Sequence, residues 1–152
     1  MSEVTLARES PRQADVAGLL EALDVYQSAL YPAESNHFLD VEALAGPAVR
    51  FFVARRGGVA LGCAALRIDA AGYGELKRMY VKPEARGLRL GRRLLDRVEA
   101  EARAAGLALL RLETGIHQPE ALGLYRSAGY REREPFGDYA PDPLSVFMEK
   151  RL

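Results

Sequence analysis

The segment from residue 75 to residue 97 constrains the fold most, because it joins a strand pattern to an amphipathic helix through a basic turn. Residues 75–81, ELKRMYV, have the length and the β-compatible side chains of a strand, and Pro83 ends that strand by removing a backbone donor. From Leu90 onward, apolar residues recur at helical spacing and arginines fill the opposite face. A strand, a tight turn and a helix in this order predict one unit of an α/β fold.

The turn between this strand and this helix has the features of an anion-binding site. Residues 86–91 read RGLRLG, where glycine permits close backbone approach and the helix start leaves N–H groups without intrahelical partners. The positive end of the helix dipole attracts anions, and arginine supplies donors suited to phosphate. We expect this basic turn, residues 86–91, to bind the pyrophosphate of a nucleotide-like cofactor. A plain helix start with a solvated basic face is the alternative.

The spacing of the glycines excludes two common phosphate-binding motifs. A P-loop requires Gly-Lys-Ser or Gly-Lys-Thr, whereas arginines follow Gly91, and a dinucleotide-binding turn requires one more glycine than Gly87 and Gly91 provide. The segment instead resembles the coenzyme A signature of the GNAT superfamily of acyl-CoA-dependent N-acyltransferases, Q/R-x-x-G-x-G/A. Arg86 and Gly91 match its two ends, and Arg89 stands where the signature has its middle glycine.

A second stretch carries the same resemblance. In the GNAT pattern, an asparagine leads into a helix with Ala-x-x-Leu-Tyr, and that helix ends at Gly-Phe or Gly-Tyr. Ala121, Leu124 and Tyr125 follow this pattern, and residues 129–130 are Gly-Tyr. Gln118 stands at the asparagine position. The wider sequence is similar to a bacterial branch of small-molecule acetyltransferases, some of which act on amino acids or on indole-3-acetate-like compounds.

Hydrophobic patterning predicts the remaining elements. The expected strands cover residues 4–7, 49–54, 59–66, 75–81, 107–113 and 146–148, and the expected helices begin near residues 10, 41, 90 and 119. A strand, helix and strand in succession imply a right-handed crossover and a parallel pair. The fold class is therefore α/β (α+β). The resemblance implies a GNAT-like fold, in which a central, mixed, mostly antiparallel twisted sheet has one parallel strand pair splayed around the cofactor and helices on both faces.

Length and composition limit the classes of function. A chain of 152 residues fits one domain, residues 1–152, and its 21 basic and 21 acidic residues cancel, so nothing in the net charge favours nucleic acid or an anionic membrane. Cys63 is the one cysteine, and its apolar neighbours indicate a buried small side chain rather than a nucleophile. No apolar run approaches the roughly 20 residues of a membrane span, and the polar start does not resemble a signal peptide. We expect a cytoplasmic protein.

The resemblance implies acetyl-CoA as the co-substrate and no metal. Backbone N–H groups near residues 79–81 would hold the thioester carbonyl, as the family's β-bulge does, and Tyr125 would protonate the coenzyme sulfur. Tyr125 as an aromatic anchor of the core is the alternative. The residues expected to contact the cofactor are Met79, Tyr80, Val81, Arg86, Gly87, Leu88, Arg89, Leu90, Gly91, Arg92, Gln118 and Tyr125.

Two carboxylates are candidates for the general base that acyl transfer to an amine requires. Glu75 resembles the family's carboxylate position, and Glu113 ends the next predicted strand. We predict Glu75 as the base, with Glu113 as the second candidate, although the sequence does not settle the choice. A structural salt bridge to Lys77 or to an arginine is the alternative role for Glu75. Candidate contacts to the acceptor are Ser35, Asn36, His37, Lys77 and Thr114. The polar and aromatic segment of residues 31–40 suits substrate recognition, although an ordinary ordered loop would look the same.

These features predict an N-acetyltransferase that moves an acetyl group directly from acetyl-CoA to the amine of a small molecule or amino acid. One alternative is a coenzyme-A-binding sensor or subunit without catalysis, which Arg89 at the usual glycine position favours. The other alternative is a protein N-acetyltransferase, which the absence of an acidic run to attract a basic peptide disfavours. Whether the chain forms a homodimer is left open.

Overall fold

The computed structural model describes residues 3–35 and 39–152, and within these ranges the strands form a seven-stranded sheet. The strands are β1 (Val4–Arg8), β2 (Val49–Arg56), β3 (Val59–Ile68), β4 (Gly74–Val81), β5 (Leu109–Gly115), β6 (Arg131–Arg133) and β7 (Ser145–Arg151). The helices are α1 (Ala14–Leu30), α2 (Val41–Leu44), α3 (Leu90–Ala104) and α4 (Pro119–Ser127). The order across the sheet is β1-β2-β3-β4-β5-β7-β6, and β4 with β5 is its parallel pair. The predicted fold class is confirmed.

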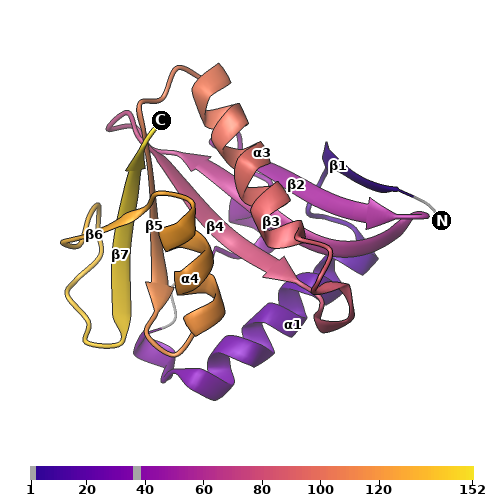
Figure 1. The fold of residues 1–152 in the computed structure, drawn as a ribbon, viewed down its shortest axis with the longest axis horizontal. Coiled ribbons are helices and arrows are strands. Elements are labelled where there is room, and N and C mark those ends of the chain that lie inside the picture. The colour runs from indigo at the N-terminus through magenta and orange to yellow at the C-terminus, as the bar shows by residue number, and fades with distance from the viewer. Residues whose placement is uncertain (1–2, 36–38) are drawn as a thin grey trace.

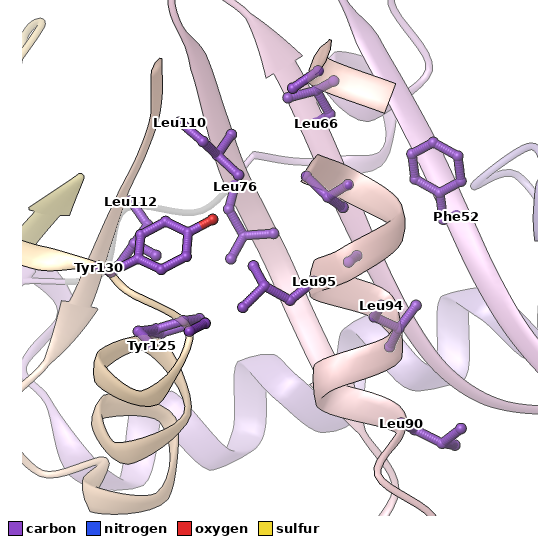
Figure 2. Close-up of a cluster of buried hydrophobic side chains, with 14 of the residues drawn as sticks. Phe52, Leu66, Leu76, Leu90, Leu94, Leu95, Leu110, Leu112, Tyr125 and Tyr130 are labelled. Atoms are coloured by element: carbon purple, nitrogen blue, oxygen red, sulfur yellow. The ribbon is translucent and has the colours of Figure 1, made fainter. Parts of the chain in front are cut away.

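Helices cover both faces of this sheet, because alternate residues of the central strands are apolar on both sides (Figure 1). On β2, Phe52 and Ala54 pack into the cluster of buried residues that includes α3 and α4. Phe51 and Val53, which point the opposite way, pack into the cluster that includes α1 and α2. Figure 2 shows the first cluster, where side chains of α3 and α4 meet those of β4 and β5. The sheet therefore separates α1 from α3 and α4.

Strands β4 and β5 separate soon after they begin. They pair at Gly74 with Leu110 and at Glu75 with Arg111, and no further register is formed between them although β4 continues to Val81. Figure 1 shows the two strands diverging toward their carboxyl ends, with α4 on one side of the opening and α1 on the other. The splayed parallel pair that the resemblance implied is thus present, and it leaves a gap in the middle of the sheet.

A β-bulge interrupts β4 at the same level. Cys63 of β3 pairs with Tyr80, and Ala65 pairs with Lys77, so two residues of β4 lie opposite one residue of β3. Arg78 within this bulge has φ 55°, in the left-handed region that glycine usually occupies. The bulge bends the edge of β4 that faces the gap.

Two details differ from the sequence expectation. Helix α1 begins at Ala14 instead of near Ser10, because Ser10 Oγ accepts a hydrogen bond from the N–H of Arg12 in a turn that precedes the helix. Strand β6, three residues long, was not expected, and its pairing with β7 is a tertiary contact that no local periodicity signals. The short helix α2 begins as predicted, with Asp40 capping it through the N–H of Ala43 at 2.8 Å.

Candidate active site

A cavity of about 680 Å³ passes through the gap between β4 and β5, a size typical of small-molecule sites. On one face of the sheet, Leu124 and Tyr125 of α4 line it. On the other face, Tyr26 and Gln27 of α1 line it. Because these helices lie on opposite faces, the cavity extends to both sides of the sheet through the gap. We refer to it as the central cavity.

The basic turn forms one end of the central cavity. Gly87 has φ 98°, and Arg89, at the N-cap of α3, has φ 57°. The expected cofactor contacts that line the cavity at this end are Arg86, Gly87, Arg89, Leu90, Gly91 and Arg92. Leu88 does not line it and instead packs against the apolar cluster beneath α3. The N–H groups of a helix start and three arginines therefore border the same end of the cavity, and Arg92 Nε also donates to Asp96 Oδ1 at 3.0 Å, an arrangement that fits a pyrophosphate.

The edge of β4 forms the wall of the cavity beside the bulge. The expected cofactor contacts Met79, Tyr80 and Val81 line it, together with Leu76, Lys77 and Arg78. This edge has no ladder partner in β5 beyond Glu75, so the backbone groups of β4 that point away from β3 border the cavity instead of a neighbouring strand. Backbone N–H groups in such a position can bond a carbonyl oxygen that develops negative charge.

Among the described residues, two glutamates line the central cavity, Glu113 on β5 and Glu120 in the first turn of α4, and Glu113 is the one that the sequence singled out. Its Oε2 accepts a hydrogen bond of 2.8 Å from Ser145 Oγ. Burial raises the pKa of Glu113 to about 7, against the lowering effects of the Ser145 hydrogen bond and the nearby Lys77 ammonium. A carboxyl group with this pKa exchanges a proton near neutral pH, which is what a general base requires.

Glu75 lies outside the lining of the central cavity and is 4% exposed. Its carboxylate accepts 2.6 Å and 3.3 Å hydrogen bonds from Tyr139 OH and Arg67 Nη1, and Lys77 Nζ lies 3.5 Å away. Lys77 also donates to Tyr139 OH at 2.7 Å. Burial and the Glu75 carboxylate raise the pKa of Tyr139, which keeps the phenol protonated as a donor. The contacts of Glu75 thus match the structural ion pair that the sequence left open.

Tyr125 reaches the central cavity from α4 and is 6% exposed. Its ring packs edge-on against Tyr130 at 6.0 Å between centroids. Burial, and secondly the Glu113 carboxylate, raise the pKa of Tyr125, so the phenol stays protonated at neutral pH. The cavity therefore holds a group able to accept a proton and a group able to donate one.

Of the expected acceptor contacts, Ser35, Lys77 and Thr114 line the central cavity. Ser35 Oγ donates a 2.7 Å hydrogen bond to Asp142, which joins the segment after α1 to the segment before β7. Asn36 and His37 lie outside the described residues. The segment of residues 31–40 therefore reaches the site through its first part.

Tyr31 is a site residue that the sequence did not single out. Its OH donates to Gln118 Oε1 and accepts from the N–H of His117, both at 3.1 Å, and its ring stacks on His117 at 5.6 Å. Tyr31 also fills the space above Gly115, where a Cβ would lie 1.8 Å from the Tyr31 oxygen. Gln118, an expected cofactor contact, lines the cavity at the start of α4. No local pattern signals these contacts, because the partners of Tyr31 lie 86 or more residues away along the chain.

The described residues show neither a metal-binding cluster nor a membrane-spanning helix. The described residues contain no group of three or more histidine, cysteine, aspartate or glutamate side chains placed to hold a metal ion. None of the helices within residues 3–35 and 39–152 combines the length and the hydropathy of a membrane span.

Comparison with known proteins agrees with this geometry. Residues 17–130 match the family described as acetyltransferase (GNAT) family. A protein of Azospirillum brasilense named IAA acetyltransferase is 60% identical over 153 residues, which cover 100% of both chains. A crystal structure of an acyl-CoA N-acyltransferase from Klebsiella pneumoniae has a TM-score of 0.83 and 41% identity, covering 98% of this chain and 97% of that chain. The PaiA N-acetyltransferase of Thermoplasma acidophilum, solved in complex with coenzyme A, shares the fold with a TM-score of 0.76, 18% identity and coverage of 99% and 98%.

Proposed function

The chain belongs to the GNAT family of acetyltransferases, and on that basis we propose that it moves an acetyl group directly from acetyl-CoA to the amine of a small molecule or amino acid. The observation that carries this proposal is the central cavity, which is lined by the basic turn, by Glu113 and by residues from both faces of the sheet. Acetyl-CoA enters beside α3 and α4, and the acceptor enters beside α1.

The residues of the basic turn suit the pyrophosphate of acetyl-CoA. The N–H groups at the start of α3 bond its oxygens, and Arg86, Arg89 and Arg92 neutralise its charge. When bound, acetyl-CoA supplies an acetyl group activated as a thioester. The N–H groups of residues 79–81 bond the carbonyl oxygen and stabilise the negative charge that forms there as the amine attacks.

Glu113 and Tyr125 serve as the proton acceptor and the proton donor of the reaction. Glu113 accepts the proton that the acceptor must lose, directly or through a water, because a protonated amine has no lone pair for attack. The new carbon–nitrogen bond forms at the acetyl carbon, the carbon–sulfur bond breaks, and Tyr125 donates its phenolic proton to the departing sulfur. The products are the N-acetylated acceptor and coenzyme A. Of the two carboxylates that the sequence left open, we assign the base to Glu113 because it lines the cavity and Glu75 does not.

The alternative of a sensor without catalysis rested on Arg89. Arg89 adopts φ 57°, which is the conformation a glycine would take, and its side chain is exposed at the mouth of the basic turn. The backbone path around the pyrophosphate site is therefore kept, and the arginine adds a positive charge. No feature of the cavity favours the sensor over the enzyme.

The test is an assay of free-thiol release from acetyl-CoA with a panel of small amines, amino acids and a peptide with a free amino terminus. We expect turnover with small acceptors, and Glu113→Gln should remove the rise in turnover between about pH 6 and 8. Glu75→Gln is the matched control, which should keep that rise. A preference for the peptide would move the assignment to protein N-acetylation, and binding without turnover on any amine would favour the sensor.

A further inference from the structure

Arg78 combines a constrained backbone with a buried charged side chain. Its φ of 55° lies in the left-handed region, which is unfavourable for a residue other than glycine. Its side chain is 5% exposed, and Nη1 bonds Asp24 Oδ1 of α1 at 2.5 Å. Nη2 bonds the carbonyl oxygen of Leu20, also on α1, at 3.3 Å. A residue in this conformation persists only where its surroundings hold it, and here α1 holds it.

The backbone of Arg78 is held as well. The Cys63 thiol on β3 donates to the carbonyl oxygen of Arg78 at 3.4 Å. The register shift of the bulge falls at the same place, between Cys63 and Ala65. Contacts from α1 and from β3 therefore fix the bulge from two directions, and the edge of β4 beside it borders the central cavity.

We propose that Arg78, tied to Asp24, is a positioning residue that sets the β4 bulge so that the N–H groups of residues 79–81 meet the thioester carbonyl. This inference rests on the proposed function, because it assumes that acetyl-CoA occupies the cavity. Helix α1 also carries Tyr26 and Gln27 at the acceptor end of the cavity. The ion pair of Arg78 with Asp24 therefore fixes the position of the acetyl carbonyl relative to α1, the helix beside which the acceptor binds.

The consequence differs from that of a merely structural ion pair. Coenzyme A and acetyl-CoA share the pyrophosphate and differ in the thioester carbonyl, so a displaced bulge weakens binding of acetyl-CoA selectively. One lost hydrogen bond of about 0.5 to 1.5 kcal/mol corresponds to roughly a 2- to 13-fold loss of affinity. The ratio of the two dissociation constants therefore reports on the bulge itself.

The experiment measures the dissociation constants of acetyl-CoA and coenzyme A by isothermal titration for wild type, Asp24→Ala and Arg78→Gly. Asp24 is 43% exposed, so its truncation leaves the core intact, and glycine at position 78 keeps the backbone conformation without the side chain. We expect both variants to lose about 2- to 13-fold in affinity for acetyl-CoA and less than about 2-fold for coenzyme A, with kcat falling in parallel. The double variant should be no worse than the worse single variant.

Glu101→Ala is the matched control. Arg50 Nη1 and Glu101 Oε2 form a strand-to-helix ion pair of 2.6 Å, and neither residue lines the central cavity. This variant should lose stability without changing the affinity ratio. An unchanged ratio and an unchanged kcat in Asp24→Ala would overturn the positioning role of Arg78. If wild type bound neither acetyl-CoA nor coenzyme A, the proposed function itself would fail.

Discussion

At the scale of single residues, Arg89 shows how a side chain can replace a glycine without closing the site. Its φ of 57° strains the backbone, and its side chain is exposed, so the strain can be measured apart from packing. Arg89→Gly and Arg89→Ala remove the same side chain and differ in their tolerance of the left-handed region. We expect Arg89→Gly to be about 1 kcal/mol more stable than Arg89→Ala in urea unfolding. Equal stabilities would mean that the turn relaxes to another conformation.

Tyr125 should act on turnover and not on cofactor affinity. Tyr125→Phe keeps the ring that packs against Tyr130 and removes the proton donor. We expect turnover to fall roughly 10- to 1000-fold, the range for loss of one general acid, with coenzyme A affinity nearly unchanged. Tyr130→Phe is the control, because Tyr130 OH bonds Glu99 at 2.7 Å away from the cavity lining and should affect stability alone. Wild-type turnover in Tyr125→Phe would leave it as a packing residue.

Glu113 should make the protein less stable as the pH rises. Its pKa is about 7 in the folded protein against 4.5 for the free group, so folding favours the protonated form. Below about pH 4.5 the group is neutral in both states and costs nothing, and above pH 7 folding must bury a charge. We expect Glu113→Gln to match wild type near pH 4.5 and to exceed it by about 1 to 3 kcal/mol at pH 8. A stability difference between Glu113→Gln and wild type that does not grow with pH would show that Glu113 is more solvated than the structure indicates.

Local sequence patterns predicted the cofactor side of the site better than the acceptor side. The basic turn is contiguous, so its residues could be named together, although the Leu88 side chain packs against the apolar cluster beneath α3 and does not line the cavity. The sequence around Arg78 carries one local signal of the β-bulge. Arg78 follows Lys77, and two consecutive charged residues break the alternation of polar and apolar side chains in a strand. No local signal marks Tyr31 as a site residue, because its hydrogen-bond partner Gln118 lies 87 residues away along the chain.

At the scale of elements, the sequence predicted strands and helices where one periodicity prevails. Helix α3 has a continuous apolar stripe and a basic outer face, and its start at Leu90 was predicted correctly. The start of α1 was wrong because the Ser10 hydroxyl bonds the nearby N–H of Arg12 and closes a separate turn. Strand β6 exists through its pairing with β7, which is visible only in three dimensions. Boundaries set by tertiary pairing were thus the part that the sequence could not provide.

The contact between Tyr31 and Gly115 joins the end of α1 to the end of β5, and it can be tested by adding one methyl group. A Cβ at residue 115 would overlap Tyr31 OH, so Gly115→Ala should destabilise the protein by about 1 to 3 kcal/mol. Tyr31→Ala removes the obstacle, so the double variant should be no less stable than Tyr31→Ala alone.

Gly123→Ala provides the matched control for this pair. Gly123 lies within α4, and nothing lies within 4 Å of an added Cβ, so alanine there should stabilise the helix by roughly 0.5 to 1 kcal/mol. Urea unfolding measures all four variants. Additive losses in the double variant would show that Tyr31 and Gly115 do not restrain each other.

At the scale of the whole molecule, the gap between β4 and β5 determines how two substrates can meet. The apolar clusters hold α1 on one face of the sheet and α3 with α4 on the other face. Acetyl-CoA therefore binds beside α3 and α4 in the proposed complex, and the acceptor binds beside α1. Cys63 lies outside the cavity lining, and burial raises the pKa of its thiol to about 12, so it cannot serve as an acyl carrier near neutral pH. The arrangement favours transfer within a complex of both substrates.

This arrangement predicts sequential kinetics. Double-reciprocal plots of initial rate against acetyl-CoA, at several fixed concentrations of an acceptor, should intersect, because both substrates must occupy the central cavity before the acetyl group moves. Coenzyme A should not be released when acetyl-CoA is mixed with the protein alone, beyond slow hydrolysis. Cys63→Ala, at a fully buried position, should keep the same intersecting pattern. Parallel lines, together with a burst of thiol release equal to the protein concentration, would instead require an acetylated side chain and would contradict direct transfer.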